Sequence, residues 1–178
     1  MTKAEIRKET LKKRKNVTNR DKKNEKILNA LTSQDFYKNA KTVMTYISFG
    51  DEVDTHALIK KMLGEKCVCA PKCITKTEME ARSFSDFSDL SAGAYGILEP
   101  NGKVVTDFDL IIVPGVAFNK DLHRIGYGAG YYDRFLSENK AVTVGLFYEV
   151  QKCDFLKDEY DYPLDYIITE EKIYQRSK

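Results

Sequence analysis

Residues 110–135, LIIVPGVAFNKDLHRIGYGAGYYDRF, form the stretch that decides how this chain folds. The stretch opens on a fully apolar segment that stops at Pro114-Gly115, which indicates a buried strand. A polar loop then carries Arg124 into three alternate glycines, Gly126, Gly128 and Gly130. The residues after the glycines favour a helix that begins near Tyr127 or Gly130 and ends at residue 138. A buried strand, a loop and a helix in this order predict an α/β protein.

Outward from this stretch, the rest of the chain repeats the alternation of helices and apolar strands. Several expected strands are apolar throughout, which is typical of a parallel sheet covered on both faces. We therefore predict a single three-layer α/β domain over residues 1–178, with a largely parallel sheet flanked by helices on both faces. Helices are expected over residues 3–15, from an N-cap at Thr18 to near Asn39, and from Asp54 or Thr55 to Leu63. Further strands are expected over residues 42–47, 66–70, 79–84, 141–147 and 166–169.

The composition is that of an ordinary globular protein, with 42% hydrophobic and 31% charged residues. No apolar run approaches the ~20 residues that span a bilayer. The N-terminus lacks the apolar core and cleavage site of a secretory signal. We therefore expect a cytoplasmic protein without a membrane partner.

The net charge of +2 conceals an asymmetry along the chain. Residues 1–26 carry a balance of +7 and the remaining residues one of −5. A basic segment of this kind fits either an anionic partner or a solvated helix face.

The four cysteines are Cys67, Cys69, Cys73 and Cys153. Their spacing differs from the paired C-x₂₋₄-C pattern of structural zinc sites. We expect buried free thiols that pack as small hydrophobic side chains.

The three glycines could form a cradle for phosphate. Alternate glycines permit positive φ and bring backbone N–H groups close to an anion, and a following helix adds its N-terminal dipole. Arg124 could bind phosphate oxygens with two parallel hydrogen bonds, and Asp133 could hold a magnesium ion beside them. The spacing alone equally fits a tight turn without a ligand, and it matches neither the P-loop nor the Rossmann fingerprint.

The run PGVAFNKDLHRIGYGAGYYDRFL closely resembles the signature of the 5-formyltetrahydrofolate cyclo-ligase family. Further matches follow in the same order along nearly the whole chain. They comprise Lys3 and Arg7, residues 48–52 (SFGDE), residues 95–100 (YGILEP) and residues 161–165 (DYPLD).

The resemblance implies ATP and 5-formyltetrahydrofolate as substrates and Mg²⁺ as cofactor. The products would be 5,10-methenyltetrahydrofolate, ADP and phosphate. Arg124 would be catalytic, and Asp133 and Asp161 would hold magnesium. Folate would contact Ile47, Glu52, Tyr131 and Tyr132. ATP would contact Lys3, Arg7, Arg124, Ile125, Gly126, Tyr127, Gly128, Ala129, Gly130, Tyr131 and Tyr132.

Four positions depart from the family pattern. Asn119, Leu122 and Ile125 stand where the family has Asp, Gly and Leu, and Ala129 replaces a Gly or Lys. A residue with a Cβ tolerates positive φ poorly, so we expect Leu122 to alter the turn before Arg124.

Two other functions remain open from the residues. The basic segment could bind RNA or DNA in a salt-sensitive way, although it leaves the glycine loop unexplained. The same architecture could also serve a sugar-phosphate or acyl-transfer enzyme that does not use ATP. We expect small-molecule substrates, no nucleic-acid partner, and a monomer or weak homodimer.

Overall fold

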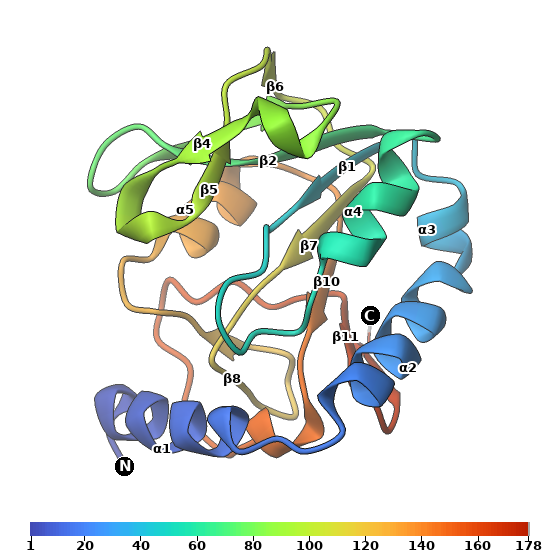
Figure 1. The fold of residues 1–178 in the computed structure, drawn as a ribbon. Coiled ribbons are helices and arrows are strands. Elements are labelled where there is room, and N and C mark those ends of the chain that lie inside the picture. The colour runs from blue at the N-terminus through green and yellow to red at the C-terminus, as the bar shows by residue number, and fades with distance from the viewer. Residues whose placement is uncertain (178) are drawn as a thin grey trace.

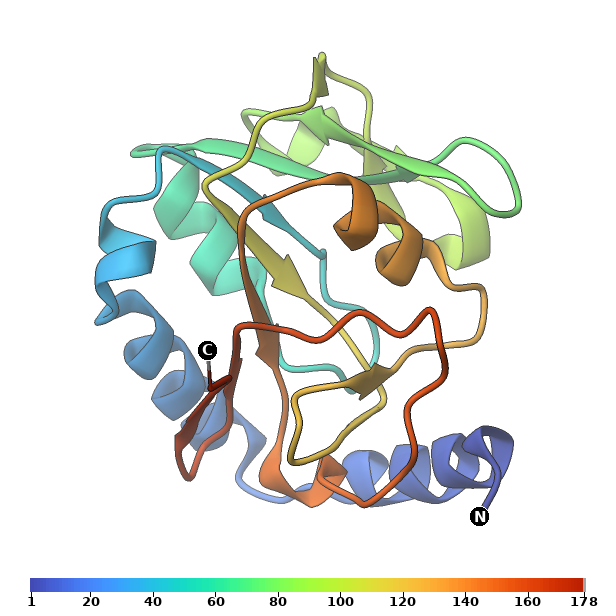
Figure 2. The same ribbon diagram turned by 180° about the vertical axis from the view of Figure 1, so that it is seen from behind.

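The computed structural model describes residues 1–177 and is organised around a central eight-stranded sheet (Figures 1 and 2). The strand order is β12-β11-β10-β7-β1-β2-β3-β6. From β11 to β2 the neighbouring strands are parallel, whereas β12, β3 and β6 pair antiparallel at the two sides. The strands are β1 (Thr42–Thr45), β2 (Cys67–Cys73), β3 (Met79–Ser83), β6 (Val104–Val105), β7 (Leu110–Val113), β10 (Val142–Leu146), β11 (Tyr166–Ile168) and β12 (Ile173–Gln175).

Helices cover both faces of this sheet, as predicted. On one face, α2 (Arg20–Thr32), α3 (Asp35–Lys38) and α4 (His56–Leu63) bury side chains such as Ile27 and Ile59 against Val43 and Ile112. On the other face, α5 (Tyr131–Glu138) packs Leu136 against the opposite side of the sheet. A largely parallel sheet between two helical layers is therefore confirmed.

The first helix, α1 (Lys3–Lys15), has the predicted bounds and lies across one end of the sheet (Figure 1). Thr2 caps it with a hydrogen bond from the Glu5 amide, and the Glu5 side chain accepts one from the Thr2 amide in return. Ile6, Thr10 and Arg14, spaced four residues apart, form its buried face. The helix therefore docks on the body of the protein instead of standing free in solvent.

Element ends and short elements differ from the prediction. Asn19, in a left-handed conformation with φ of 50°, precedes α2 instead of Thr18, and the helix expected to run to Asn39 is divided into α2 and α3. Short strands were not predicted because two or three residues are too few to show a period. The remaining elements are β4 (Leu90–Ala92), β5 (Leu98–Pro100), β8 (Ala117–Phe118), β9 (Arg124–Ile125) and the 3₁₀ helices Phe87–Asp89, Ala94–Gly96 and Glu149–Gln151.

The cysteines follow the prediction only in part. Cys69 is buried in the sheet, but Cys67 is exposed, and Cys73 and Cys153 are partly buried. Cys67 is exposed because it is the first residue of β2, at the end of the strand.

The order of the strands marks a place for a ligand. From β1 the chain passes through α4 to β2 on one side, and from β7 it passes through α5 to β10 on the other. Because β1 and β7 are neighbours, their connections diverge and leave a crevice beyond their carboxyl ends. Within residues 1–177, no helix has the length and apolar character needed to cross a bilayer.

Candidate active site

A cleft of about 1670 Å³ opens at the carboxyl ends of β1 and β7. This volume exceeds the 300–1,000 Å³ typical of a pocket for one small molecule, so two ligands can fit side by side. All the site residues expected from the sequence line this cleft. They are Lys3, Arg7, Ile47, Glu52, Arg124, Ile125, Gly126, Tyr127, Gly128, Ala129, Gly130, Tyr131, Tyr132, Asp133 and Asp161.

The turn before Arg124 contains two of the four residues that depart from the family pattern, Asn119 and Leu122. Leu122 has φ of 61°, so a leucine occupies the left-handed conformation that glycine adopts without strain. Its side chain is almost completely buried, and this packing holds the strained backbone in place. Asn119 accepts hydrogen bonds from the amides of Asp121 and His123, as an Asp could, and its amide group donates to the Phe155 carbonyl, as an Asp could not. The two substitutions are thus accommodated by burial and by one added hydrogen bond.

Arg124 lies at the inner wall of the cleft and is only 3% exposed. One of its terminal nitrogens lies 3.5 Å from Asp133 Oδ1, and the guanidinium lies 5.4 Å from the centre of the Tyr132 ring. Its Nε has no acceptor within residues 1–177. Burial lowers the pKa of Arg124, and the charge of Asp133 offsets this only in part. A buried cation with an unused donor is suited to bind an anion that enters the cleft.

The glycine loop, residues 126–130, continues from Arg124 to α5. Gly128 and Gly130 have φ of 115° and 70°, and Gly130 is the N-cap of α5. None of the five loop amides donates to a protein acceptor within residues 1–177. Free amides at the start of a helix are typical of a phosphate site.

Two basic residues of α1 reach the same end of the cleft. Arg7 Nε donates to the Gly126 carbonyl at 2.7 Å, which fixes α1 against the glycine loop. Lys3 Nζ lies 2.6 Å from Asp158 and 2.5 Å from Asp161. Burial lowers the Lys3 pKa, but the hydrogen bonds and charges of the two carboxylates outweigh it and raise the pKa overall.

The two acidic residues expected to bind magnesium, Asp133 and Asp161, are connected by a hydrogen bond to the backbone next to Asp161. Asp133 Oδ1 accepts a hydrogen bond from the Tyr162 amide at 3.1 Å, and Tyr162 follows Asp161 directly. Asp133 Oδ2 and Asp161 Oδ1 have no hydrogen-bond donor within residues 1–177. No cluster of three or more metal-binding side chains occurs in that part of the chain. Two free carboxylate oxygens fit Mg²⁺, which is commonly held by one or two carboxylates together with substrate phosphates and water.

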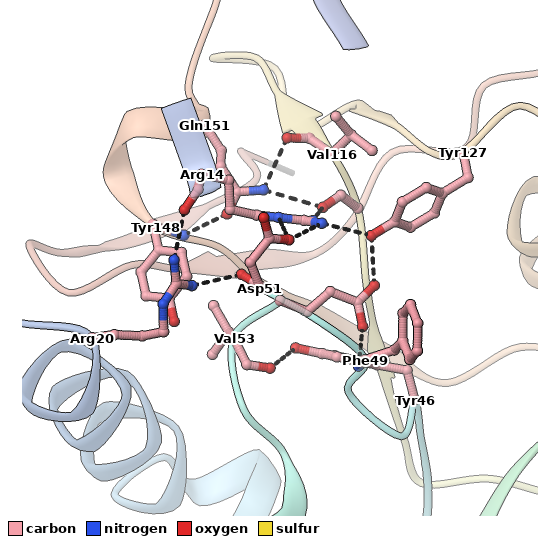
Figure 3. Close-up of polar contacts among 12 residues, drawn as sticks. Arg14, Arg20, Tyr46, Phe49, Asp51, Val53, Val116, Tyr127, Tyr148 and Gln151 are labelled. Atoms are coloured by element: carbon pink, nitrogen blue, oxygen red, sulfur yellow. Dashed lines mark hydrogen bonds and ion pairs between the residues drawn. The ribbon is translucent and has the colours of Figure 1, made fainter. Parts of the chain in front are cut away.

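The sequence did not predict the role of Arg14, the last buried residue of α1. Arg14 Nε and Nη2 contact Asp51 Oδ1 at 2.8 and 2.7 Å, and Nη2 also donates to the Tyr127 hydroxyl at 3.0 Å (Figure 3). Nη1 donates to the carbonyl of Gly115, just beyond β7. Its four-residue spacing from Ile6 and Thr10 was the available signal that Arg14 lies on the buried face.

Glu52 lies at the far end of this chain of contacts. Its Oε1 accepts a hydrogen bond from the Tyr127 hydroxyl at 2.7 Å, and its Oε2 accepts one from the Phe49 amide at 2.8 Å. Burial raises the pKa of Glu52, while the hydrogen bonds from Phe49 and Tyr127 and the charge of Arg14 oppose the rise. The carboxylate thus has one partner in its own β1–α4 loop and one, Tyr127, in the glycine loop.

Apolar and aromatic side chains also line the cleft. Ile47 is buried just after β1, and Tyr131 donates from its hydroxyl to the Thr75 carbonyl at 2.9 Å. Phe49 lines the same cleft and is exposed. Such a wall is suited to a flat heterocyclic ligand.

Comparison with known proteins gives a consistent result across the chain. The model of the 5-formyltetrahydrofolate cyclo-ligase family matches residues 1–170. A probable 5-formyltetrahydrofolate cyclo-ligase from Schizosaccharomyces pombe is 37% identical over 160 residues, which cover 77% of this chain and 78% of the relative. A 5-formyltetrahydrofolate cyclo-ligase from Mycoplasma pneumoniae is 33% identical over 181 residues, covering 96% of this chain and 100% of the relative.

Solved structures show the same similarity in three dimensions. The NMR structure of a 5,10-methenyltetrahydrofolate synthetase from Aquifex aeolicus superposes with a TM-score of 0.89 at 35% identity, and covers 100% of this chain and 94% of that one. A 5,10-methenyltetrahydrofolate synthetase from Mycoplasma pneumoniae superposes with a TM-score of 0.77 at 27% identity, covering 96% and 99% of the two chains.

Proposed function

This chain belongs to the 5-formyltetrahydrofolate cyclo-ligase family, and we propose that it converts 5-formyltetrahydrofolate to 5,10-methenyltetrahydrofolate with ATP and Mg²⁺. The observation that carries the proposal is the placement of the free loop amides and Arg124 in the same cleft as Glu52. An anion site and a carboxylate site within one cleft of about 1670 Å³ suit two substrates that must react with each other.

The proposed reaction solves a leaving-group problem. The formyl oxygen of an N5-formyl group is a poor leaving group, so N10 cannot displace it directly. The formyl oxygen therefore attacks the γ-phosphorus of ATP, and ADP leaves. N10 then adds to the formyl carbon and loses its proton, and the C–O bond breaks to release phosphate as the ring closes. The products are 5,10-methenyltetrahydrofolate, ADP and phosphate.

Phosphoryl transfer depends on positioning and on neutralising charge. Arg124 is proposed to bind the transferred phosphoryl group, because it is buried in the cleft and carries an unused donor. The amides of residues 126–130 would hold the polyphosphate, with Arg7 and Lys3 supplying positive charge from α1. Mg²⁺ held by Asp133 and Asp161 would neutralise phosphate charge.

Glu52 is proposed to orient the folate. The pterin ring carries adjacent N–H groups, and the Glu52 carboxylate, bound to Phe49 and Tyr127, can accept hydrogen bonds from them. Ile47, Tyr131 and Tyr132 would supply the apolar wall of that site. The basic N-terminal segment gains a role in this arrangement, because Lys3, Arg7 and Arg14 line the cleft.

The test is an absorbance assay for the methenyl product with purified protein. We expect product only when ATP, Mg²⁺ and 5-formyltetrahydrofolate are all present, and we expect EDTA to stop its formation. Asp133→Asn should need more Mg²⁺ for half-maximal rate, whereas Asp107→Asn, which changes an exposed carboxylate that does not line the cleft, should not. Product formed without ATP, or no product with all three components present, would contradict the proposal.

A further inference from the structure

Tyr127 connects the two halves of the cleft. Its backbone belongs to the glycine loop, residues 126–130, and its side chain leaves the loop toward the opposite wall (Figure 3). Tyr127 as a whole is 57% exposed, but its hydroxyl lies between Arg14 and Glu52. One residue therefore joins the proposed phosphate site to the proposed folate site.

The contacts on either side of Tyr127 differ in rigidity. Arg14 is 3% exposed and is anchored by Asp51 and by the Gly115 carbonyl. Asp51 is held in turn through its own carbonyl, which accepts a hydrogen bond from Arg20 at 2.7 Å. The glycine loop, by contrast, is held by side chains only at Gly126 and Ala129, whose carbonyls accept hydrogen bonds from Arg7 and Arg134. Between them, neither Tyr127 nor Gly128 makes a backbone hydrogen bond within residues 1–177. The Tyr127 hydroxyl thus contacts the anchored Arg14 side chain, while the Tyr127 backbone lies in a segment that a ligand can order.

Ordering of that segment has an energetic consequence. Phosphates bound to the loop amides would restrict the backbone at Tyr127 and hence the position of its hydroxyl. Glu52 would then be aligned before folate enters, so folate would no longer have to meet the entropy cost of aligning it. Linkage requires the reverse effect to be equal, so bound folate must strengthen ATP binding by the same factor.

We propose that Tyr127 is a positioning residue that makes the binding of ATP and folate cooperative, through its hydrogen bond to Glu52. The proposal rests on the function proposed above. It adds that the phenol hydroxyl, which need not touch either substrate, transmits the effect between them.

The test measures the affinity of each ligand alone and with the other present, by calorimetry with Mg²⁺ and a non-hydrolysable ATP analogue. For the wild-type protein we expect each ligand to raise the affinity for the other about fivefold or more. Tyr127→Phe keeps the ring and removes the hydroxyl. In this variant the factor by which one ligand raises the affinity for the other should fall to near one. The affinity for the ATP analogue alone should change less than about twofold, because the proposed phosphate contacts of Tyr127 use its backbone. In steady state, KM for folate should rise more than kcat falls.

Tyr160→Phe is the matched control. Tyr160 lines the same cleft and is 82% exposed, and its hydroxyl has no hydrogen-bond partner within residues 1–177. This variant should keep the wild-type factor, and all three proteins should unfold at similar temperatures. A Tyr127→Phe protein with wild-type cooperativity, or a wild-type protein without any, would overturn the inference while ATP-dependent turnover still upheld the proposed function. Failure of turnover and of binding by the wild-type protein would remove both.

Discussion

Arg124 combines burial, positive charge and an unused donor, a combination that costs stability. Burial lowers its pKa, which means that the fold disfavours the charged form that the guanidinium must carry. Within residues 1–177 its one ion pair, to Asp133, is long at 3.5 Å. Groups that weaken the fold in this way are common at functional sites, where a ligand supplies the missing partner.

Replacing Arg124 should separate activity from stability. We expect Arg124→Ala to lower kcat by about 10²–10³-fold, as loss of a donor to a charged transition state does. The thermal midpoint should be unchanged or higher, because the substitution removes a poorly paired buried charge. Arg124→Lys should recover part of the rate through its charge. A folded Arg124→Ala protein with near wild-type turnover would show that Arg124 is not catalytic.

Two opposing effects on stability meet at Leu122. Its φ of 61° strains the backbone, whereas burial of its side chain stabilises the fold. Leu122→Gly relieves about 1 kcal/mol of strain but loses packing worth about 2–5 kcal/mol, so it should be less stable than wild type. Leu122→Ala loses the packing and keeps the strain, so it should be less stable still by about 1 kcal/mol. Urea unfolding gives the order. An alanine variant more stable than the glycine variant would contradict the left-handed conformation.

At the scale of elements, Asp109 joins the starts of two central strands. Its Oδ2 accepts hydrogen bonds from the amide of Thr42, the first residue of β1, at 2.9 Å and from the Lys41 amide at 2.7 Å. These two bonds lower the pKa of Asp109 from its ordinary value. Because the pKa is depressed in the folded state, the contribution to stability is present above the unfolded pKa of about 3.9 and is lost as pH falls through the folded value.

The unfolding free energy of Asp109→Asn should therefore depend on pH differently from that of the wild type. At pH 7 we expect the variant to be less stable by about 1 kcal/mol, because the charge and one accepted hydrogen bond are lost. The difference should shrink below about pH 4 as Asp109 is protonated in the wild type. Asp107→Asn, two residues away and exposed, should show no difference at either pH. A deficit that persists unchanged at low pH would argue against the charge of Asp109.

Some elements were predictable because their signals are local. The start of α1 follows from the capping box of Thr2 and Glu5, and β7 follows from four consecutive buried apolar residues. The glycine loop was recognised from its spacing, but its conformation was not, since the sequence does not show that Gly128 and Gly130 take positive φ.

The role of Arg14 could not be predicted in the same way. An arginine in a basic helix is usually solvated, and its four-residue spacing from Ile6 and Thr10 indicates the buried face but not the partners. Its partners Asp51 and Gly115 lie 37 and 101 residues away and come together only when the sheet forms. The link from Tyr127 to Glu52, 75 residues apart, was hidden for the same reason.

At the scale of the whole molecule, α1 forms one wall of the cleft and is held largely by its own buried face. Ile6 packs on Ala117 and Ile125 of the hairpin formed by β8 and β9, and Arg14 bonds to the loops after β1 and β7. The cleft thus depends on docking of a helix that is otherwise polar and basic.

Arg14→Ala should weaken the docking of α1 on the body of the protein, because it removes the contacts to Asp51 and Gly115. We expect a loss of about 2–3 kcal/mol, less than for a fully buried ion pair because Asp51 is partly exposed. Amide hydrogen exchange over residues 3–15 should become faster than over the central strands. Lys12→Ala, an exposed change on the same helix, should leave exchange unaltered. Equal protection of α1 in Arg14→Ala and wild type would show that Arg14 does not anchor it.

The central claim is that the cleft aligns ATP against the formyl oxygen of the folate. The most direct measurement follows that oxygen, using 5-formyltetrahydrofolate labelled with ¹⁸O in the formyl group and unlabelled ATP and water. Mass spectrometry of the released phosphate reports where the oxygen goes. Phosphoryl activation predicts that the ¹⁸O appears in phosphate, one atom for each methenyl product formed. Unlabelled phosphate, with the ¹⁸O lost to water, would contradict the account.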